Sequence, residues 1–416
     1  MRHRGHLVTG EGRGRVRARW LVTLVWGCAL GCSEPGPKAQ IPIGLLLSYS
    51  GTLAANSVNS ERALLMAIEA TNAAGGIAGR DVAVIARDTR SAPRKVTPMA
   101  QALLDEKVAL VIGPDTIALA VELKALLSEQ TLIMPSFTTS DSSIYKPRSW
   151  FVMGPSPARV ACELYTQLRL AGWRAPVVPT DPNGFDNLLG RELAFSYGLR
   201  QVFLPADDAS NETTVQPIVS VGADAFVLAA LPQAATSLIY TLAALGQIGD
   251  ARRWYLSPTL HTPALLETIP HGLLEGAHGV KAGTVVGSKE FAEQFQRRWQ
   301  DKPLDDAYAF YDAGAIAVLA LQRALVRDGA VPTGTGLVPH VIAVSNASGT
   351  PVQWNELGLG LELLRQGQEV GYQGLSGPLD FDASGESAPA NTTWWRIGPD
   401  GFEDVPSQSD CRKTSR

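Results

Sequence analysis

The chain has 416 residues, of which 45% are apolar and 18% are charged. A single hydrophobic core stops growing at roughly 250–300 residues, so we expect two domains, each with its own core. This composition excludes large-scale disorder, and no run of Lys or Arg beyond residue 31 indicates a nucleic-acid surface. The net charge of −4 conceals a basic leader, because the first 31 residues hold six of the 36 basic residues but only one of the 40 acidic ones.

This leader has the layout of an export signal. An arginine-rich segment precedes an apolar stretch at residues 20–30, which is shorter than the roughly 20 residues that a membrane-spanning helix needs. Residues 29–32 (ALGC) then resemble the lipobox of bacterial lipoproteins, in which the Cys becomes the lipidated N-terminus. We therefore expect a signal peptide over residues 1–31, lipidation at Cys32 and a Pro- and Gly-containing tether over residues 32–40. An ordinary signal peptide and a short anchor helix are the alternatives.

Two further cysteines, Cys162 and Cys411, lie in the exported part of the chain. An exported protein meets an oxidising compartment, where the two can form a disulfide. Sequence alone does not say whether their Cα atoms lie close enough for a bond. Two isolated thiols are therefore an equal alternative.

Apolar runs and helical spacing alternate along the exported part. Short apolar runs predict buried strands, and apolar residues three and four apart predict helices. In the first half, the predicted strands lie at residues 43–47, 81–86, 108–112 and 132–134, and the predicted helices at 57–70, 93–106 and 117–130.

The same alternation restarts after Ser156. Predicted strands follow near residues 176–178, 225–228 and 254–256, and predicted helices at 158–171, 187–197 and 233–245. Strand–helix alternation with short connections is typical of parallel sheets covered by helices on both faces. We therefore expect two successive α/β units of similar size.

Polar loops follow three of the strands predicted in the first unit. Residues 48–50, 113–116 and 135–140 are rich in Gly and hydroxyl side chains. In open parallel sheets, ligands bind beyond the carboxyl ends of the strands, and hydroxyls with helix-start N–H groups suit an anion such as a carboxylate. Each hydroxyl can instead cap the next helix, but three such loops on one sheet edge favour a polar pocket.

Several segments, taken in order, resemble the branched-chain amino acid-binding proteins, which are type I periplasmic solute-binding proteins. Residues 43–89 match their opening strand, Ser/Thr-Gly loop and long helix, and residues 108–136 match their Ile-Gly-Pro and Pro-Ser loops. Residues 306–320 resemble their Tyr-Asp-Ala helix, and residues 374–382 their Gly-x-x-Gly-Pro-x-x-Phe-Asp turn. The resemblance covers nearly all of residues 41–398.

The resemblance implies an α/β fold of two Rossmann-like lobes with parallel sheets, joined by a three-strand hinge. It places lobe 1 at residues 41–155 plus 283–372, lobe 2 at 156–282 plus 373–405, and a tail at 406–416. It also implies a monomer on the periplasmic side of the bacterial cell envelope. Such a protein captures a small polar solute (an amino acid, an amide or a small carboxylate) and delivers it to the permease of an ABC transporter.

The family's ligand contacts carry over to nine positions of this chain. The first lobe holds the α-carboxylate through the third and fourth loops, and the second lobe covers the ligand. The corresponding residues are Ser50, Asn56, Thr116, Ser136, Phe137 and Thr138 in the first lobe, and Asn183, Phe185 and Thr259 in the second.

This chain departs from the family at the position that binds the ammonium group. Amino-acid binders carry an acid after a second-lobe strand, where this chain has Thr259. A buried ammonium without a counter-charge is unfavourable. Either Asp115 or Asp186 substitutes for that acid, or the ligand is a carboxylate, an amide such as urea, or an aromatic acid.

Sequence motifs of catalysis and metal binding are incomplete in this chain. Ser143-x-x-Lys146 has no K-T-G partner, and the glycine-rich residues 72–80 lack the Gly-Lys-Ser/Thr of a phosphate loop. Tyr311-Asp312 is interpreted as a packing and capping pair. The histidines beyond the leader have no metal-ligand spacing; they are His261, His271, His278 and His340.

We therefore expect no catalytic activity, no metal, no cofactor and no nucleic-acid partner, and a membrane association made only through the N-terminal lipid. The alternatives to transport are a ligand-sensing or envelope-assembly lipoprotein on the same fold, and a homologue that has lost its ligand.

Overall fold

The computed structural model describes most of the chain between residues 40 and 411. The described ranges are 40–51, 54–135, 147–182, 184–204, 212–283, 287–346, 348–381, 383, 385, 387, 392–406 and 411. The predicted signal peptide, the lipidation site and most of the tether lie outside them. So do four predicted ligand contacts, which are Ser136, Phe137, Thr138 and Asn183.

A five-stranded parallel sheet forms the centre of the first lobe. Its strands are β1 (Ile41–Leu47), β2 (Val82–Asp88), β3 (Val111–Ile112), β4 (Leu132–Met134) and β5 (Trp150–Val152). Their order is β2-β1-β3-β4-β5, and every neighbouring pair runs parallel. Six of the seven residues of β1 are buried, as expected for a strand whose sheet has helices on both faces.

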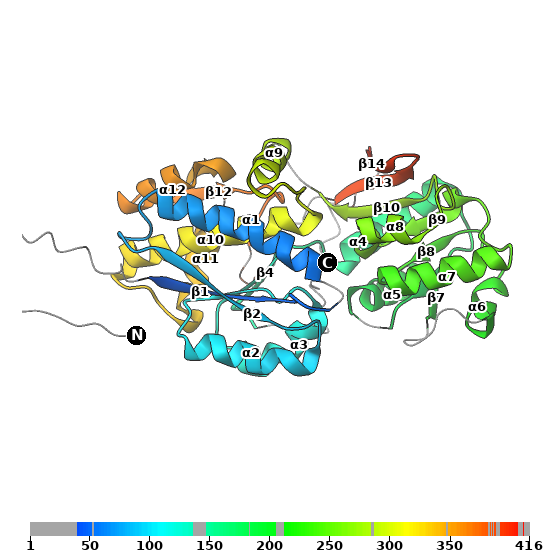
Figure 1. Ribbon diagram of the computed structural model, residues 1–416, viewed down its shortest axis with the longest axis horizontal. Coiled ribbons are helices and arrows are strands. Elements are labelled where there is room, and N and C mark those ends of the chain that lie inside the picture. The colour runs from blue at the N-terminus through cyan, green and yellow to red at the C-terminus, as the bar shows by residue number, and fades with distance from the viewer. Residues whose placement is uncertain are drawn as a thin grey trace, which may run out of the picture. The chain divides into compact units, whose positions relative to one another are not determined.

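Helices cover both faces of this first sheet. They are α1 (Ala54–Ala73), α2 (Pro93–Asp105), α3 (Ile117–Leu127), α9 (Ser288–Trp299), α10 (Asp305–Asp328), α11 (Val338–Ser345) and α12 (Leu357–Arg365). Helices α2 and α3 pack on one face, and α1 and α10 on the other (Figure 1). Helix α10 is apolar and long enough to cross a membrane, but 83% of its apolar window is buried, which is the pattern of a central core helix.

The second lobe is built around a seven-stranded mixed sheet. Its strands are β6 (Val177–Thr180), β7 (Arg200–Phe203), β8 (Phe226–Leu228), β9 (Trp254–Leu256), β10 (His278–Ala282), β13 (Thr392–Gly398) and β14 (Gly401–Val405). Their order is β14-β13-β10-β9-β8-β6-β7, with β6 to β10 parallel. Strands β13 and β14 add an antiparallel edge. The expected α/β fold with parallel sheets is therefore confirmed, with this edge as an addition.

The helices of the second lobe also lie on both faces of its sheet. They are α4 (Pro157–Leu170), α5 (Gly184–Tyr197), α6 (Glu212–Val219), α7 (Pro232–Ala244) and α8 (Pro263–Thr268). One core joins α4 and α5 to the sheet, and a second core joins α6, α7 and α8 to its other face. This arrangement places the starts of α5 and α7 at the carboxyl ends of β6 and β8, where ligands bind in open parallel sheets.

The first long helix ends three residues beyond residue 70, where the sequence predicted its end. Helix α1 ends at Ala73, and the chain then turns through Gly75 and Gly76, which have φ angles of 92° and 67°. A Cβ on Gly76 would lie 2.1 Å from the carbonyl oxygen of Arg80, so the turn requires glycine there. The turn brings the chain back to β2 beside β1.

The segment after β12 (Val370–Gln373) belongs to the first lobe, contrary to the boundary expected at residue 372. Leu375 and Phe381 are part of the first lobe's core, and the Phe381 ring lies 5.0 Å from that of Phe151. The peptide N–H groups of Leu375 and Ser376 donate to the Asp312 carboxylate on α10, which holds this segment in place. The first lobe therefore extends at least to Phe381. Strand β12 itself pairs in parallel with β11 (Thr350–Gln353).

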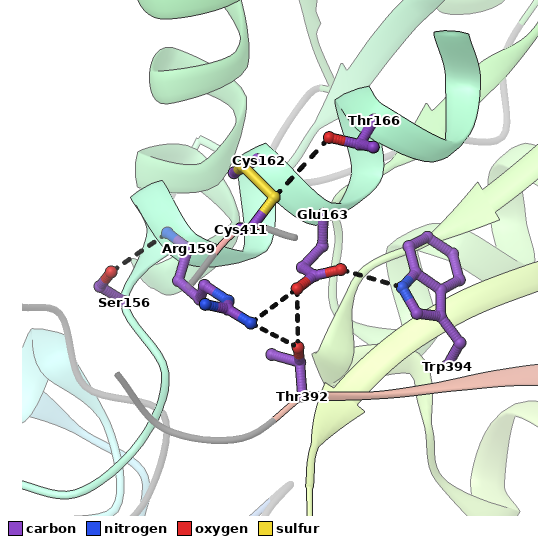
Figure 2. Close-up of a disulfide and its surroundings, with 8 residues drawn as sticks. All are labelled: Ser156, Arg159, Cys162, Glu163, Thr166, Thr392, Trp394 and Cys411. Carbon is purple, nitrogen blue, oxygen red and sulfur yellow. Dashed lines mark hydrogen bonds and ion pairs between the residues drawn. A yellow bond between two sulfur atoms is a disulfide. The ribbon is translucent and has the colours of Figure 1, made fainter. Parts of the chain in front are cut away.

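Cys162 and Cys411 form a disulfide, with their Cα atoms 6.0 Å apart, which decides between the two alternatives above. Figure 2 shows that the bond joins the end of the chain to α4. The neighbouring Glu163 accepts hydrogen bonds from Arg159 at 2.8 Å and from Thr392 at 3.0 Å. Helix α4 is thereby linked to both the tail and strand β13.

Candidate functional site

The loops that follow β1 and β3 meet at one edge of the first sheet, because parallel neighbours end on the same side. The carboxylate of Asp115 joins them. It accepts hydrogen bonds from the Ser48 N–H at 2.9 Å, from the Ser48 hydroxyl at 3.1 Å and from the Ser57 hydroxyl at 3.1 Å. Burial raises the pKa of Asp115, and these hydrogen bonds oppose the rise.

Asp115 reduces the number of hydrogen-bond donors that this sheet edge can offer to an anionic ligand. The loop after β1 was predicted to offer neutral donors to an anion, but the donors of Ser48 already serve the protein's own carboxylate. The Ser48 hydroxyl also shares a hydrogen bond of 2.8 Å with Thr89. An anionic ligand here would have to compete with Asp115 and would be repelled by it.

The three described first-lobe contacts have different surroundings. Ser50 donates its hydroxyl to Asp88 at 2.7 Å, so its proton is engaged. Thr116 caps α3 by accepting from the Leu119 N–H at 3.4 Å, which leaves its own O–H proton available. Asn56 lies half-buried in the first turn of α1.

Phe185, which the resemblance places over the ligand, packs mainly within the protein. It is 5% exposed and belongs to the core that joins α4 and α5 to the second sheet. The physical reason is local, because α5 begins at Gly184, and the first turn directs Phe185 toward the sheet.

Thr259 and Asp186 meet at the carboxyl edge of the second sheet. Thr259 lies in a short turn after β9, and Asp186 lies in the first turn of α5, after the nearby strand β6. The Thr259 hydroxyl is 2.9 and 3.0 Å from the two Asp186 carboxylate oxygens and 2.7 Å from the Ser257 hydroxyl. Asp186 therefore contacts Thr259, the residue that stands where the family's amino-acid binders have an acid.

The Asp186 carboxyl group is almost completely buried, with 2% of the residue exposed. Burial raises its pKa to about 7, against the opposing hydrogen bonds from Ser257 and Thr259, and the charge of Asp181 adds to the rise. When it is ionised, the Asp186 carboxylate accepts hydrogen bonds from the hydroxyls of Thr259 and Ser257. The Thr259 oxygen also lies 3.1 Å from the carbonyl oxygen of Ala230.

His261 links the same loop to the first lobe. Its Nδ1 lies 2.5 Å from the carboxylate of Asp305 at the start of α10. The ring packs against Trp395 and Phe402, with centroid distances of 5.0 and 4.3 Å. Lys281 supports the pair, at 3.9 Å from Asp305. The sequence held no local signal for this contact, because its partners are 44 positions apart.

Within the described ranges, no group of three or more His, Cys, Asp or Glu side chains is arranged to hold a metal ion. The polar groups at the two sheet edges are hydroxyls and carboxylates. Such groups can bind a small solute by hydrogen bonds and charge.

Comparison with known proteins places these features in a family. A model of periplasmic binding proteins matches residues 40–397. The chain is 25% identical, over 83% of its length and 84% of the relative, to the chemotactic signal transduction system substrate-binding protein BasB of Halobacterium salinarum. It is 28% identical over 109 residues to the Leu/Ile/Val-binding protein BraC3 of Rhizobium johnstonii, which is 26% of this chain and 30% of that relative.

Solved structures share the fold at low identity. The branched-chain amino acid-binding protein LivJ of Streptococcus pneumoniae, in complex with isoleucine, has a TM-score of 0.71 at 16% identity, covering 88% of this chain and 99% of that one. A solute-binding protein of R. palustris, in complex with benzoate, has a TM-score of 0.67 at 17% identity, covering 89% and 98%. The chain therefore belongs to the periplasmic binding protein family and has the type I fold of its branched-chain amino acid-binding members.

Proposed function

We propose that this protein is an extracytoplasmic lipoprotein that captures a small polar solute between its two lobes and delivers it to an ABC transporter. The observation that carries the proposal is the pair of polar sheet edges, one at Asp115 and Thr116 and the other at Asp186 and Thr259. The names of the relatives, which include amino-acid and benzoate binders, support a small organic solute.

The proposed mechanism is binding by closure. A solute that contacts both sheet edges binds the closed arrangement of the lobes better than the open one, and so shifts the population toward closure. The permease then recognises the closed surface of a monomeric binding protein. The division into two lobes, with the hinge at the three passages of the chain, is part of this proposal.

The proposal is tested by a thermal-shift screen of residues 33–416, produced without the leader. The compounds are amino acids, short amides, aromatic acids, small carboxylates and amines. A saturable rise in Tm with one chemical class is expected, because a ligand that binds only the folded state stabilises it. A well-folded sample that responds to no compound would contradict solute binding.

The loop after β4 supplies a second test. We expect Thr138→Ala to weaken binding of the solute by about 1–3 kcal/mol, the usual effect of leaving a polar partner unsatisfied. Thr236→Ala, which alters an exposed hydroxyl on α7, is the matched control. Equal affinities of both variants in calorimetry would remove Thr138 from the site.

Lipid attachment is proposed at Cys32. Cys32→Ser is expected to abolish labelling with a fatty-acid probe and to release the protein from membranes. Cys28→Ser, four residues earlier in the same leader, is the matched control and should keep the label. Labelling that survives in Cys32→Ser would place the anchor elsewhere.

A sensing role is the second candidate, favoured by the similarity to a substrate-binding protein of a chemotactic signal transduction system. The two roles differ in what deletion of the gene does. Loss of uptake of the bound solute supports transport. Unchanged uptake with loss of the cells' chemotactic response to that solute supports sensing.

A further inference from the structure

We infer that Asp88 is a positioning residue for solute binding, which holds the loop after β1 in place with the help of the strained residues Arg90 and Ser91. The inference rests on the proposed function, because this loop lies at the first of the two sheet edges that we propose bind the solute. It gives Ser50 a role in shaping the loop, whereas the resemblance placed Ser50 in contact with the solute.

The loop after β2 lies beside the loop after β1. The two strands are parallel neighbours, and Leu47 at the end of β1 pairs with Asp88 at the end of β2. Both loops therefore leave the sheet at its carboxyl edge, where ligands bind in folds of this kind. Their approach is close, because a Cβ on Gly51, which has a φ of 89°, would lie 2.9 Å from the Ser91 hydroxyl oxygen. Glycine at this position permits both the turn and the contact.

Ser50 gives each of its polar groups to the loop after β2. Its N–H donates to Oδ1 of Asp88 at 3.2 Å, and its hydroxyl donates to Oδ2 of Asp88 at 2.7 Å. Its carbonyl oxygen accepts from the Ser91 hydroxyl at 3.2 Å. We call these three contacts the Ser50 clamp. They fix the loop after β1 at an exposed residue and leave Ser50 no donor for a solute.

A second carboxylate holds the same loop two residues earlier. The N–H and the hydroxyl of Ser48 both donate to Asp115, at 2.9 and 3.1 Å, as those of Ser50 do to Asp88. Asp115 directly precedes Thr116, whose hydroxyl proton is available to a solute. The two carboxylates together therefore determine where the loop after β1 lies relative to Thr116.

The loop that carries the Ser50 clamp is strained. Arg90 and Ser91 follow Asp88 with φ angles of 59° and 51°, in the left-handed region that residues other than glycine disfavour. The Arg90 N–H donates to Oδ1 of Asp88 at 2.8 Å, which helps to hold this backbone. Backbone strain persists where the surrounding contacts over-determine it, and such places cluster at functional sites. The strain therefore supports a role of this loop in binding, in addition to its role in the fold.

The charge of Asp88 suits the clamp. Burial raises the pKa of Asp88, but hydrogen bonds from Ser50, from the Arg90 N–H and from the Tyr49 N–H outweigh it and lower the pKa. The ionised carboxylate accepts with both of its oxygens, whereas an Asn amide accepts with one and presents an N–H2 group to the other donors. Asp88→Asn is therefore the substitution that opens the clamp with the least change in shape.

The first experiment measures the clamp itself, in Asp88→Asn and in a matched control, Asp105→Asn. Asp105 is an exposed acid that also accepts from a side chain, Gln101 at 3.0 Å, but it ends α2 at the opposite edge of the sheet. We expect the Ser50 amide hydrogen to exchange with solvent at least about tenfold faster in Asp88→Asn than in the control or the unaltered protein. Equal exchange in all three proteins would overturn the inference.

Affinity is then measured by calorimetry, with the compound of the thermal-shift screen that raises Tm most. Asp88→Asn should bind this compound at least about threefold more weakly than the unaltered protein, because the binding edge is no longer preorganised. Asp105→Asn should bind it as the unaltered protein does. Equal affinity of Asp88→Asn would overturn the positioning role and leave solute binding intact. A screen in which no compound raises Tm would instead contradict the proposed function, and the positioning role would fall with it.

The second experiment separates positioning from folding. Arg90→Gly relieves strain beside the clamp, and Lys107→Gly, the matched control, relieves it at an exposed residue with a φ of 57° between α2 and β3. Both variants should melt at or above the Tm of the unaltered protein, because glycine adopts this backbone without a steric penalty. Only Arg90→Gly should weaken binding of the same compound, by at least about threefold, because it frees the loop that carries the clamp. Unchanged affinity in Arg90→Gly, or a loss of affinity that accompanies a lower Tm, would overturn the inference.

Discussion

Asp312 and Asp186 are both fully buried carboxylates, but their surroundings differ in kind. Asp312 accepts four hydrogen bonds, from the Tyr372 hydroxyl, the Leu375 N–H, and the Ser376 N–H and hydroxyl, at 2.6 to 3.0 Å. Asp186 is held by the hydroxyls of Thr259 and Ser257. Among the described residues neither has a cation beside it, so the donors alone distinguish them.

The difference separates Asp312, a structural acid that backbone N–H groups hold, from Asp186, which hydroxyl groups hold. Peptide N–H groups are fixed by the backbone, and those around Asp312 hold the segment after β12 against α10. Hydroxyl donors rotate and carry lone pairs that can turn toward a ligand. The predictions below test this distinction, beginning with the largest effect.

Removing the structural acid should have the largest effect. We expect Asp312→Ala to lower the free energy of unfolding by about 3–5 kcal/mol, because it leaves buried donors without an acceptor. Asp301→Ala, at an exposed acid paired with Arg62, is the control and should change stability by less than about 1 kcal/mol. Urea unfolding measures both. A loss near that of the control would place Asp312 in the same class as an ordinary surface acid.

The pH dependence of stability should single out Asp186. Its pKa is raised to about 7, so the folded state holds this proton more tightly than the unfolded state does. The resulting stabilisation is present below the ordinary pKa of aspartate and is lost as the pH rises through 7.

The free energy of unfolding of the unaltered protein should therefore fall by roughly 2–4 kcal/mol between pH 4 and pH 8. In Asp186→Asn this decrease should be absent. Unfolding of the ligand-free proteins by urea at those two values is the measurement. Parallel pH profiles for the two proteins would show that Asp186 titrates as it does in the unfolded chain.

Two substitutions of Thr259 should distinguish the effect of its hydroxyl on binding from the effect of its side-chain shape. Thr259→Val keeps the volume and removes the hydroxyl, and we expect about tenfold weaker binding of the solute, or about 1.4 kcal/mol. Thr259→Ser keeps the hydroxyl and should bind within about threefold of the unaltered protein. Calorimetry at pH 8 measures both, and equal losses in the two variants would show that the methyl group matters instead.

The hydrogen bond between His261 and Asp305 should give the smallest effect. Both groups are partly exposed, so we expect His261→Asn to weaken solute binding by about 1 kcal/mol, by loosening the loop that carries Thr259. A double-mutant cycle with Asp305→Asn isolates the pair. His271→Asn, at an exposed position on the same lobe, is the control. Additive losses in the cycle would show that the contact does not couple the loop to α10.

Much of the fold was predictable because buried strands leave a local signal. The strands predicted at residues 132–134 and 254–256 are β4 and β9 without adjustment. The antiparallel edge of β13 and β14 was not predicted, since its residues follow a segment with no regular apolar pattern.

The site was less predictable because its contacts join distant positions. Thr259 was identified as a departure from the family, but its partner Asp186 lies 73 positions away, and only the order of the strands brings them together. The orientation of Phe185 depended on whether α5 begins before or after it. Asp312 packs inside the protein as interpreted, but it lies in the middle of α10 and its donors are 60 to 64 positions later in the chain.

One measurement tests the central claim most directly: the affinity for the captured solute in the unaltered protein, in Thr116→Val and in Thr259→Val. A solute held between the two sheet edges should bind more weakly in both variants, because each variant removes a hydroxyl from one edge. Unchanged affinity in both variants would contradict the account.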